Sequence, residues 1–207
     1  MGYARRMSNL ALVTLAATLS VAKGAAVNDK PRLTSIANDI AAVVESRQNQ
    51  VFTGEGGGVA LAMMLVAIAK HESEFQAAVD SCARRGDGGR SITLFQILRG
   101  PNWAGHKAEE ICADRRLAVQ LTVDLLARPI VLAAQPGAPP RAFTPQMIVN
   151  AYATGSAGMQ TEASKSICSF WEQLARSAGL EGAACGVARS YAAPRPAPAP
   201  APAQASG

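Results

Sequence analysis

The sequence has few aromatic residues and lacks the common metal and phosphate motifs. Phe, Trp and Tyr together make up 5% of the 207 residues, and no basic run is interleaved with them, so it shows no nucleic-acid footprint. The four cysteines form no Cys-x-x-Cys pair and no His/Cys cluster, which argues against a zinc site. The glycines at 56–58 are not followed by Lys-Ser/Thr, so they do not make a phosphate loop. We therefore expect no cofactor, no metal and no nucleic-acid partner.

The apolar runs of the sequence are short. The run near the start of the chain has the features of a secretory signal. Arg5 and Arg6 precede an apolar stretch at 10–22, and small residues at 20–26 fit a cleavage site. The stretch is too short to span a bilayer comfortably. We therefore favour export, with residues 1–26 removed and the mature protein in the periplasm or secreted. An uncleaved signal is the alternative, and it would be the chain's only membrane contact.

Four cysteines in an exported chain predict two disulfides. Three connectivities are possible, and we favour Cys82–Cys112 with Cys168–Cys185, because each pair closes a local loop. The alternative is that the cysteines are free, buried thiols.

The rest of the chain is long enough for one domain with its own core, at 27–191. A Pro/Ala-rich tail at 192–207 should be extended and mobile. Helical spacing of apolar residues predicts helices at 31–48, 59–74, 106–128, 144–155 and 161–178. Residues 91–98 are rich in β-formers and predict a short strand or hairpin, and the prolines in 129–142 indicate a surface connection. The fold class should be mainly α (α+β).

Glu72 is the best-placed acid in the sequence. It ends a mostly apolar helix, and burial raises the pKa of a carboxylic acid enough for it to stay protonated at neutral pH. A protonated carboxyl is what glycosidic-bond cleavage needs at the leaving oxygen. The alternative is an ordinary, exposed residue at a helix end.

Four short motifs, in order, resemble those of the soluble lytic transglycosylases, which share a fold with goose-type lysozymes. They are E-S-x-F at 72–75, a serine at 81, L-F-Q-I at 94–97 and A-Y-x-x-G at 151–155. The serine follows the Phe by six residues, as in that family. The resemblance covers roughly residues 33–178 and implies a lysozyme-like fold with a small β element flanking the catalytic cleft.

The resemblance also implies an activity and a set of site residues. The activity is cleavage of the β-1,4 bond between N-acetylmuramic acid and N-acetylglucosamine in peptidoglycan, by a monomer acting on glycan strands. Glu72 matches the family's sole acid/base and Ser81 the serine that orients it. Gln96 matches a glutamine lining the sugar cleft, and Tyr152 a tyrosine reaching the acid from the opposite wall. No second carboxylate is required, because the substrate's N-acetyl oxygen assists and the muramyl 6-hydroxyl closes a 1,6-anhydro ring.

The sequence departs from the family pattern in ways that leave two alternatives open. Thr93 stands where the family has a glycine that lets the glycan approach the backbone, and Ala153 stands where it has an asparagine. A non-catalytic peptidoglycan-binding protein is one alternative. The other is a hydrolytic lysozyme in which Asp80 or Asp87 supplies a second carboxylate that activates water.

Overall fold

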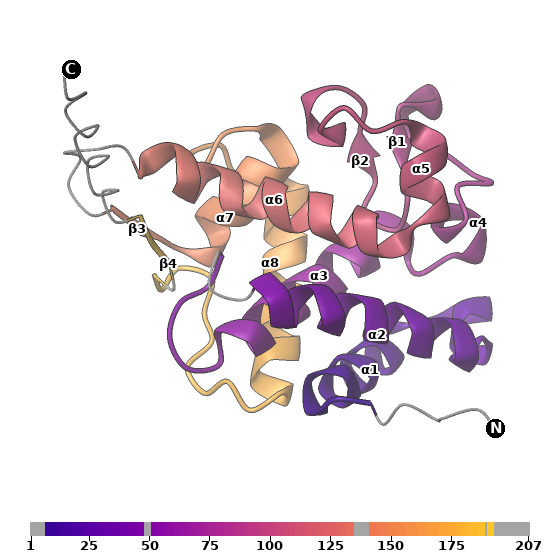
Figure 1. Cartoon of the computed structure of the whole chain (residues 1–207). Helices are drawn as coiled ribbons and strands as arrows, with labels where there is room; N and C mark the ends of the chain where they lie inside the picture. Colours follow the sequence, from indigo (N-terminus) through magenta and orange to yellow (C-terminus); the bar gives the residue numbers. More distant parts are fainter. Residues whose placement is uncertain (1–6, 48–50, 135–140, 189, 193–207) are drawn as a thin grey trace, which may run out of the picture.

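The computed structural model describes residues 7–47, 51–134, 141–188 and 190–192. Within these ranges the chain is mainly helical, as the sequence predicts, with two small antiparallel sheets (Figure 1). The helices are α1 (Asn9–Val21), α2 (Lys30–Arg47), α3 (Gly57–Ser73), α4 (Ala77–Asp80), α5 (Ala108–Ala113), α6 (Arg115–Ala133), α7 (Pro145–Thr154) and α8 (Glu162–Ser177). The strands are β1 (Ser91–Ile92) paired with β2 (Ile97–Leu98), and β3 (Arg141–Phe143) paired with β4 (Ser190–Ala192). The predicted tail lies outside the described residues, apart from Ala192.

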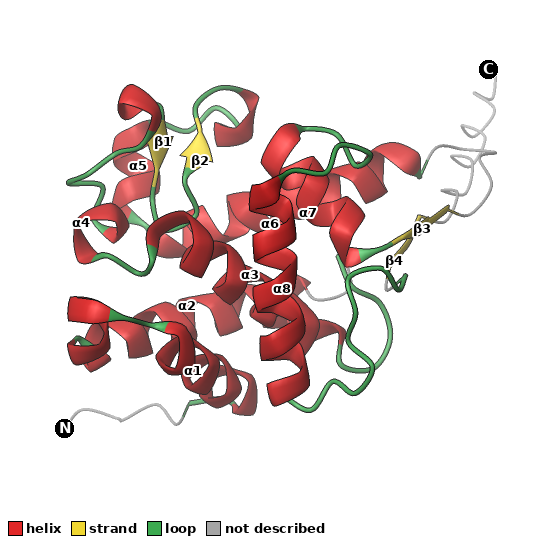
Figure 2. Ribbon diagram, turned by 180° about the vertical axis from the view of Figure 1, so that it is seen from behind, coloured by secondary structure: helices red, strands yellow, loops and turns green. Residues whose placement is uncertain are grey.

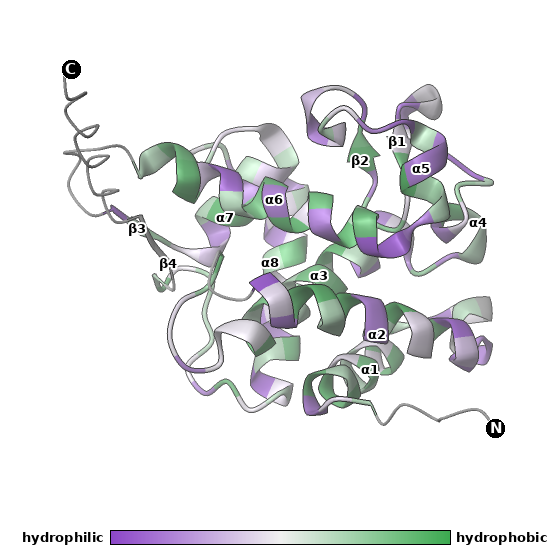
Figure 3. Ribbon diagram, viewed as in Figure 1, coloured by the Kyte–Doolittle hydropathy of each residue, from purple (hydrophilic) through white to green (hydrophobic). Residues whose placement is uncertain are grey.

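Helix α3 is the centre of the core. Residues 60–70 are all buried, because small and aliphatic side chains let neighbouring helices approach from every side. Helices α1, α2 and α8 all pack on it (Figure 2). The indole of Trp171 in α8 donates a hydrogen bond of 2.9 Å to the Ala60 carbonyl and stacks on Phe52. Figure 3 shows α3 as apolar, whereas α2 and α6 carry polar residues on their outer faces.

The apolar run predicted as a signal peptide forms α1, which packs on α2 and α3. Ala17 and Val21 join the main core, and the buried hydroxyls of Thr14 and Thr18 donate to carbonyls one turn earlier in the same helix. Removal of this segment stays a prediction. Among the described residues, no helix is long and apolar enough to cross a membrane.

The long helix predicted at 106–128 is two helices. The break is at Asp114, whose extended backbone ends α5 and whose carboxylate caps α6 by accepting from the amides of Arg116 and Leu117. Helix α6 then continues through Pro129 to Ala133, so the surface connection predicted from residue 129 begins later. Pro129 lies in the second-last turn of α6, where the loss of one amide donor affects only the helix end.

Both favoured disulfides are present and confirm the predicted connectivity. The Cα atoms are 5.8 Å apart in Cys82–Cys112 and 6.0 Å apart in Cys168–Cys185. The first joins the segment after α4 to α5, on the side of the β1–β2 hairpin. The second joins α8 to the segment that leads into β4. A pair of disulfides favours an oxidising compartment.

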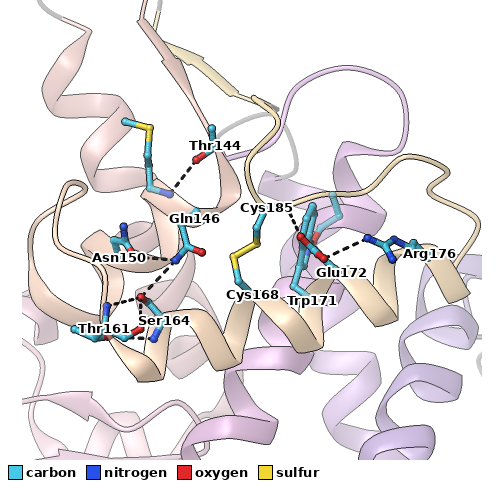
Figure 4. Close-up of a disulfide and its surroundings, with 12 residues drawn as sticks. Thr144, Gln146, Asn150, Thr161, Ser164, Cys168, Trp171, Glu172, Arg176 and Cys185 are labelled. Atoms are coloured by element: carbon cyan, nitrogen blue, oxygen red, sulfur yellow. Dashed lines mark hydrogen bonds and ion pairs between the residues drawn. A yellow bond between two sulfur atoms is a disulfide. The ribbon is translucent and has the colours of Figure 1, made fainter.

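Hydrogen bonds between polar side chains hold α7 against α8 next to the second disulfide (Figure 4). The Gln146 amide donates to Asn150 Oδ1 at 2.9 Å and to Ser164 Oγ at 3.4 Å. Close by, the amide of Cys185 donates to Glu172 at 2.7 Å. Buried polar groups that satisfy one another in this way set a unique packing arrangement. These contacts with α8 fix the position of α7, which carries Tyr152, one of the predicted site residues.

Candidate active site

A cleft of about 730 Å³ opens where the end of α3 meets the β1–β2 hairpin, α6 and α7. Glu72, Gln96 and Tyr152 all line it, so the structure brings together three of the four residues that the sequence predicted. Leu125, Pro129 and Leu132 of α6 add apolar surface to the cleft, and Arg128 of the same helix lines it as well. A cleft with apolar surface and a few convergent polar groups is suited to a sugar polymer.

Glu72 is the penultimate residue of α3, is partly buried and lines this cleft. Burial first, and the negative charge of Asp87 second, raise the pKa of Glu72 to about 7. No hydrogen bond from another described residue holds its carboxyl group. The group is therefore protonated for much of the time at neutral pH, and its proton is free for a ligand in the cleft.

Asp87 shares the cleft with Glu72, together with Ser91. The Ser91 hydroxyl donates a short hydrogen bond to the Asp87 carboxylate. Asp87 belongs to the Asp-Gly-Gly turn, and its own φ of 49° is left-handed, a conformation that Asp tolerates better than most residues. The sequence indicated the turn and named Asp87 only as an alternative, and Ser91 was missed. Asp87 and Ser91 are four residues apart, so the sequence alone could have indicated that they lie close together. Only the fold shows that they share the cleft with Glu72.

Tyr152 of α7 lines the same cleft as Glu72, and the two groups are close enough to interact electrostatically. Its hydroxyl donates a short hydrogen bond to the backbone carbonyl of Phe95 in the hairpin. Burial, and then the nearby Glu72 carboxylate, raise the pKa of Tyr152 well above its ordinary value. The Tyr152 hydroxyl uses its proton in the hydrogen bond to the hairpin. Its oxygen can still accept a hydrogen bond from a protonated carboxyl or a sugar hydroxyl.

Gln96 lines the cleft from the turn between β1 and β2. Its amide nitrogen donates to the Thr93 carbonyl at 3.0 Å. Its amide oxygen lies so close to Gly86 that a Cβ there would come within 2.1 Å of it. The absent side chain at Gly86 therefore leaves the space that Gln96 needs.

Thr93, where the resemblance leads one to expect a glycine, has a left-handed backbone conformation and does not line the cleft. Its φ is 67°, which is strained for a β-branched residue. The residue is only 4% exposed and is not among those that line the cleft. Ala153, the other departure, is exposed and does line it. The substitution at 93 therefore does not narrow the cleft.

The structure does not bring Ser81 to Glu72, in contrast to the prediction. Ser81 follows α4, a single turn that directs its hydroxyl to the carbonyl of Ala78 at 3.5 Å. It lines a different hollow, with Arg32 and Arg115. Ser91 lines the cleft, and Ser81 does not.

Asp80 is also outside the cleft and cannot act as a second carboxylate. Its side chain is 6% exposed and lies between Arg115, at 2.8 Å, and Arg32, at 3.3 Å. Arg115 also pairs with Asp39 of α2. This network of ion pairs ties α4 to α2 and α6.

The ionisable residues next to Glu72 in the sequence, His71 and Glu74, make their contacts outside the cleft. Glu74 caps α3 in a left-handed conformation and pairs with Lys70 at 3.3 Å. The His71 ring is 3.2 Å from the Ser166 hydroxyl on α8, and burial lowers the pKa of His71. Within the described ranges, no group of three or more His, Cys, Asp or Glu side chains could hold a metal ion.

The chain was compared with protein-family models, curated proteins and solved structures. None of the three comparisons found a match.

Proposed function

We propose that this protein is a peptidoglycan lytic transglycosylase with a lysozyme-like fold, and that Glu72 is its acid/base. The observation that carries the proposal is a carboxyl group with a pKa of about 7 that lines an open cleft together with Tyr152 and Gln96. A general acid works best when its pKa is close to the working pH. Three of the four sequence motifs, those with Glu72, Gln96 and Tyr152, support the same site independently of the geometry.

The reaction needs one proton donor that becomes a proton acceptor. Glu72 donates its proton to the glycosidic oxygen as the bond from that oxygen to the muramyl C1 breaks. The substrate's N-acetyl oxygen stabilises the positive charge at C1. The Glu72 carboxylate then takes the proton of the muramyl 6-hydroxyl while that oxygen bonds to C1. Water is not consumed, and Glu72 ends in the protonated form in which it began.

The surrounding residues support these steps through positioning. Tyr152 offers an oxygen acceptor in the same cleft as Glu72, and Gln96 offers an amide at the hairpin wall. Burial of Glu72 limits the access of water to the acid, and Leu125 and Pro129 of α6 add apolar surface to the cleft. Low water content raises the pKa of Glu72 and strengthens each polar contact to the substrate.

We also propose that the protein is exported and acts on the cell wall as a monomer. The two disulfides support an oxidising compartment.

Mass spectrometry of soluble products from purified sacculi tests the function. The expected fragments are lighter than hydrolytic fragments by one water, because an internal hydroxyl replaces water as the nucleophile. Glu72→Gln should abolish their release while the fold is kept. A variant that retains nearly full activity would refute the assignment of Glu72.

A hydrolytic lysozyme is the second candidate, because Asp87 lies in the same cleft as Glu72. A second carboxylate could activate a water molecule for attack at C1. Asp87→Asn would then abolish activity, and the wild-type products would carry reducing muramic ends. Soluble fragments that carry anhydro ends and persist in Asp87→Asn would exclude this candidate.

The non-catalytic alternative predicts binding without products. Protein found on the sacculi, with no fragments in solution, would favour it.

A further inference from the structure

A further hollow, of about 440 Å³, lies beside the β1–β2 hairpin. Arg85, Arg99 and Lys107 line it, together with Trp103. We call this the basic pocket. One carboxylate, Glu109, also lines it, so its fixed charges are predominantly positive.

The basic pocket and the catalytic cleft share a wall. Leu98 and Asn102 line the cleft, while Arg99 and Trp103 line the basic pocket. The segment 98–103 therefore contributes side chains to both hollows and lies between them. A ligand branch that leaves the cleft over this segment enters the basic pocket directly.

In the part of the chain that the structure describes, no carboxylate forms an ion pair with the cations of the basic pocket, although Lys107 lies close enough to Glu110 to lower its pKa. Within the described residues, Arg85, Arg99 and Lys107 form no ion pair, whereas Arg32 and Arg115 elsewhere are fully engaged. Like charges around one hollow repel one another, and an anionic ligand relieves that repulsion.

One of these cations is held in place. The Arg99 guanidinium lies 6.0 Å from the ring centroid of Trp103, within the range of a cation–π contact. The Trp103 indole is fixed in turn by a hydrogen bond of 3.1 Å to the Ile97 carbonyl. An arginine that is already oriented loses less entropy when it binds a carboxylate.

We propose that the basic pocket binds the carboxylates of the stem peptide of peptidoglycan, while the glycan strand lies in the cleft. This inference rests on the proposed function. The stem peptide branches from the lactyl group of muramic acid and carries several carboxylates, so it is the anionic branch that a bound strand presents. Arginine forks match carboxylates in geometry as well as charge. The single Glu109 carboxylate is suited to an amino group of the same peptide.

The test compares two glycan substrates and two sets of variants. One substrate is glycan with its stem peptides, and the other is the same glycan after an amidase has removed them. The double variant Arg85→Gln/Lys107→Gln removes two charges from the basic pocket and leaves the Trp103 contact intact. Arg84→Gln is the matched control, because Arg84 is exposed and unpaired within the described residues but does not line the pocket.

The double variant should lower kcat/KM on peptide-bearing glycan by about three- to tenfold at low salt, which is the size expected for two exposed ion pairs. It should leave kcat/KM on stripped glycan unchanged, and the loss should shrink at high salt. Arg84→Gln should change neither value. An equal loss on both substrates, or an equal loss in Arg84→Gln, would overturn the proposal in favour of general charge attraction.

A binding measurement separates this inference from the proposed function. If wild-type protein cleaves neither glycan, the proposed catalytic function fails, and NMR titration with a free stem tripeptide still tests the pocket. Shifts at residues around Arg99 that disappear in the double variant and persist in Arg84→Gln would support the pocket. No shifts in the wild type would reject it.

Discussion

The raised pKa of Glu72 predicts that Glu72→Gln is inactive yet more stable than the wild type. Ionising Glu72 in its buried site, beside Asp87, costs free energy that a glutamine does not incur. A pKa difference of one corresponds to about 1.4 kcal/mol. The rise from 4.5 to about 7 therefore lowers the free energy of unfolding of the wild type by about 3 kcal/mol above pH 7.

The sign of the pH dependence follows from the two pKa values. Below pH 4.5 the carboxyl is protonated in both the folded and the unfolded chain, so Glu72→Gln should match the wild type. Between pH 4.5 and 7 the unfolded chain releases the proton and the folded chain keeps it, so the wild type loses stability as pH rises. The advantage of Glu72→Gln should thus appear across this window and level off above it.

Urea unfolding at pH 4 and pH 8 measures the difference, and glycan cleavage at pH 6 measures the activity. General acid catalysis contributes about 10²- to 10⁴-fold, so the loss of rate should be of that size. Glu45→Gln is the control, because Glu45 is exposed on α2 and a surface change should alter stability by less than about 0.5 kcal/mol. Equal stability of Glu72→Gln and the wild type at pH 8 would refute the reasoning, since it would mean that Glu72 ionises without cost.

Three further predictions concern the cleft and its supports. Asp87→Asn removes a charge that raises the pKa of Glu72, so the alkaline limb of the pH–rate profile should move to lower pH; an unchanged limb would contradict the coupling. Thr93→Gly should be more stable than Thr93→Ala by about 1 kcal/mol in thermal melts, because only glycine relieves a φ of 67°, and a more stable alanine variant would be inconsistent with strain. Replacing Cys168 and Cys185 together by serine should lower the free energy of unfolding by about 3 kcal/mol, from a loop of 17 residues, and calorimetry with and without reductant provides the measurement and its control.

Local patterns in the sequence predicted much of the fold. The buried run of α3 is apolar all round, and its polar residues begin where the helix reaches the cleft. The β-forming segment at 91–98, predicted as a short strand or hairpin, forms the β1–β2 hairpin. The spacing of the cysteines predicted both disulfides correctly. Each of these features depends on neighbours that lie within about 30 positions along the chain.

Features that depend on distant contacts could not be predicted. Pairing of β3 with β4 joins segments almost 50 positions apart, and neither strand has a strong pattern of its own. Ser81 was placed by its interval from Phe75, but α4 turns it outward and Ser91 occupies the cleft. The helix break at Asp114 was missed because apolar residues continue on both sides of it and a single capping residue interrupts the pattern.

The hydrogen bond from Tyr152 to the Phe95 carbonyl joins α7 to the β1–β2 hairpin, two elements that neither disulfide connects. Neither disulfide therefore fixes the distance between the two elements. A hydrogen bond contributes about 1 kcal/mol net, so parting the two elements at this point is inexpensive. A long polymer could therefore enter sideways along its length, without being threaded from an end. The chain would then be able to act within a continuous mesh that exposes few free ends.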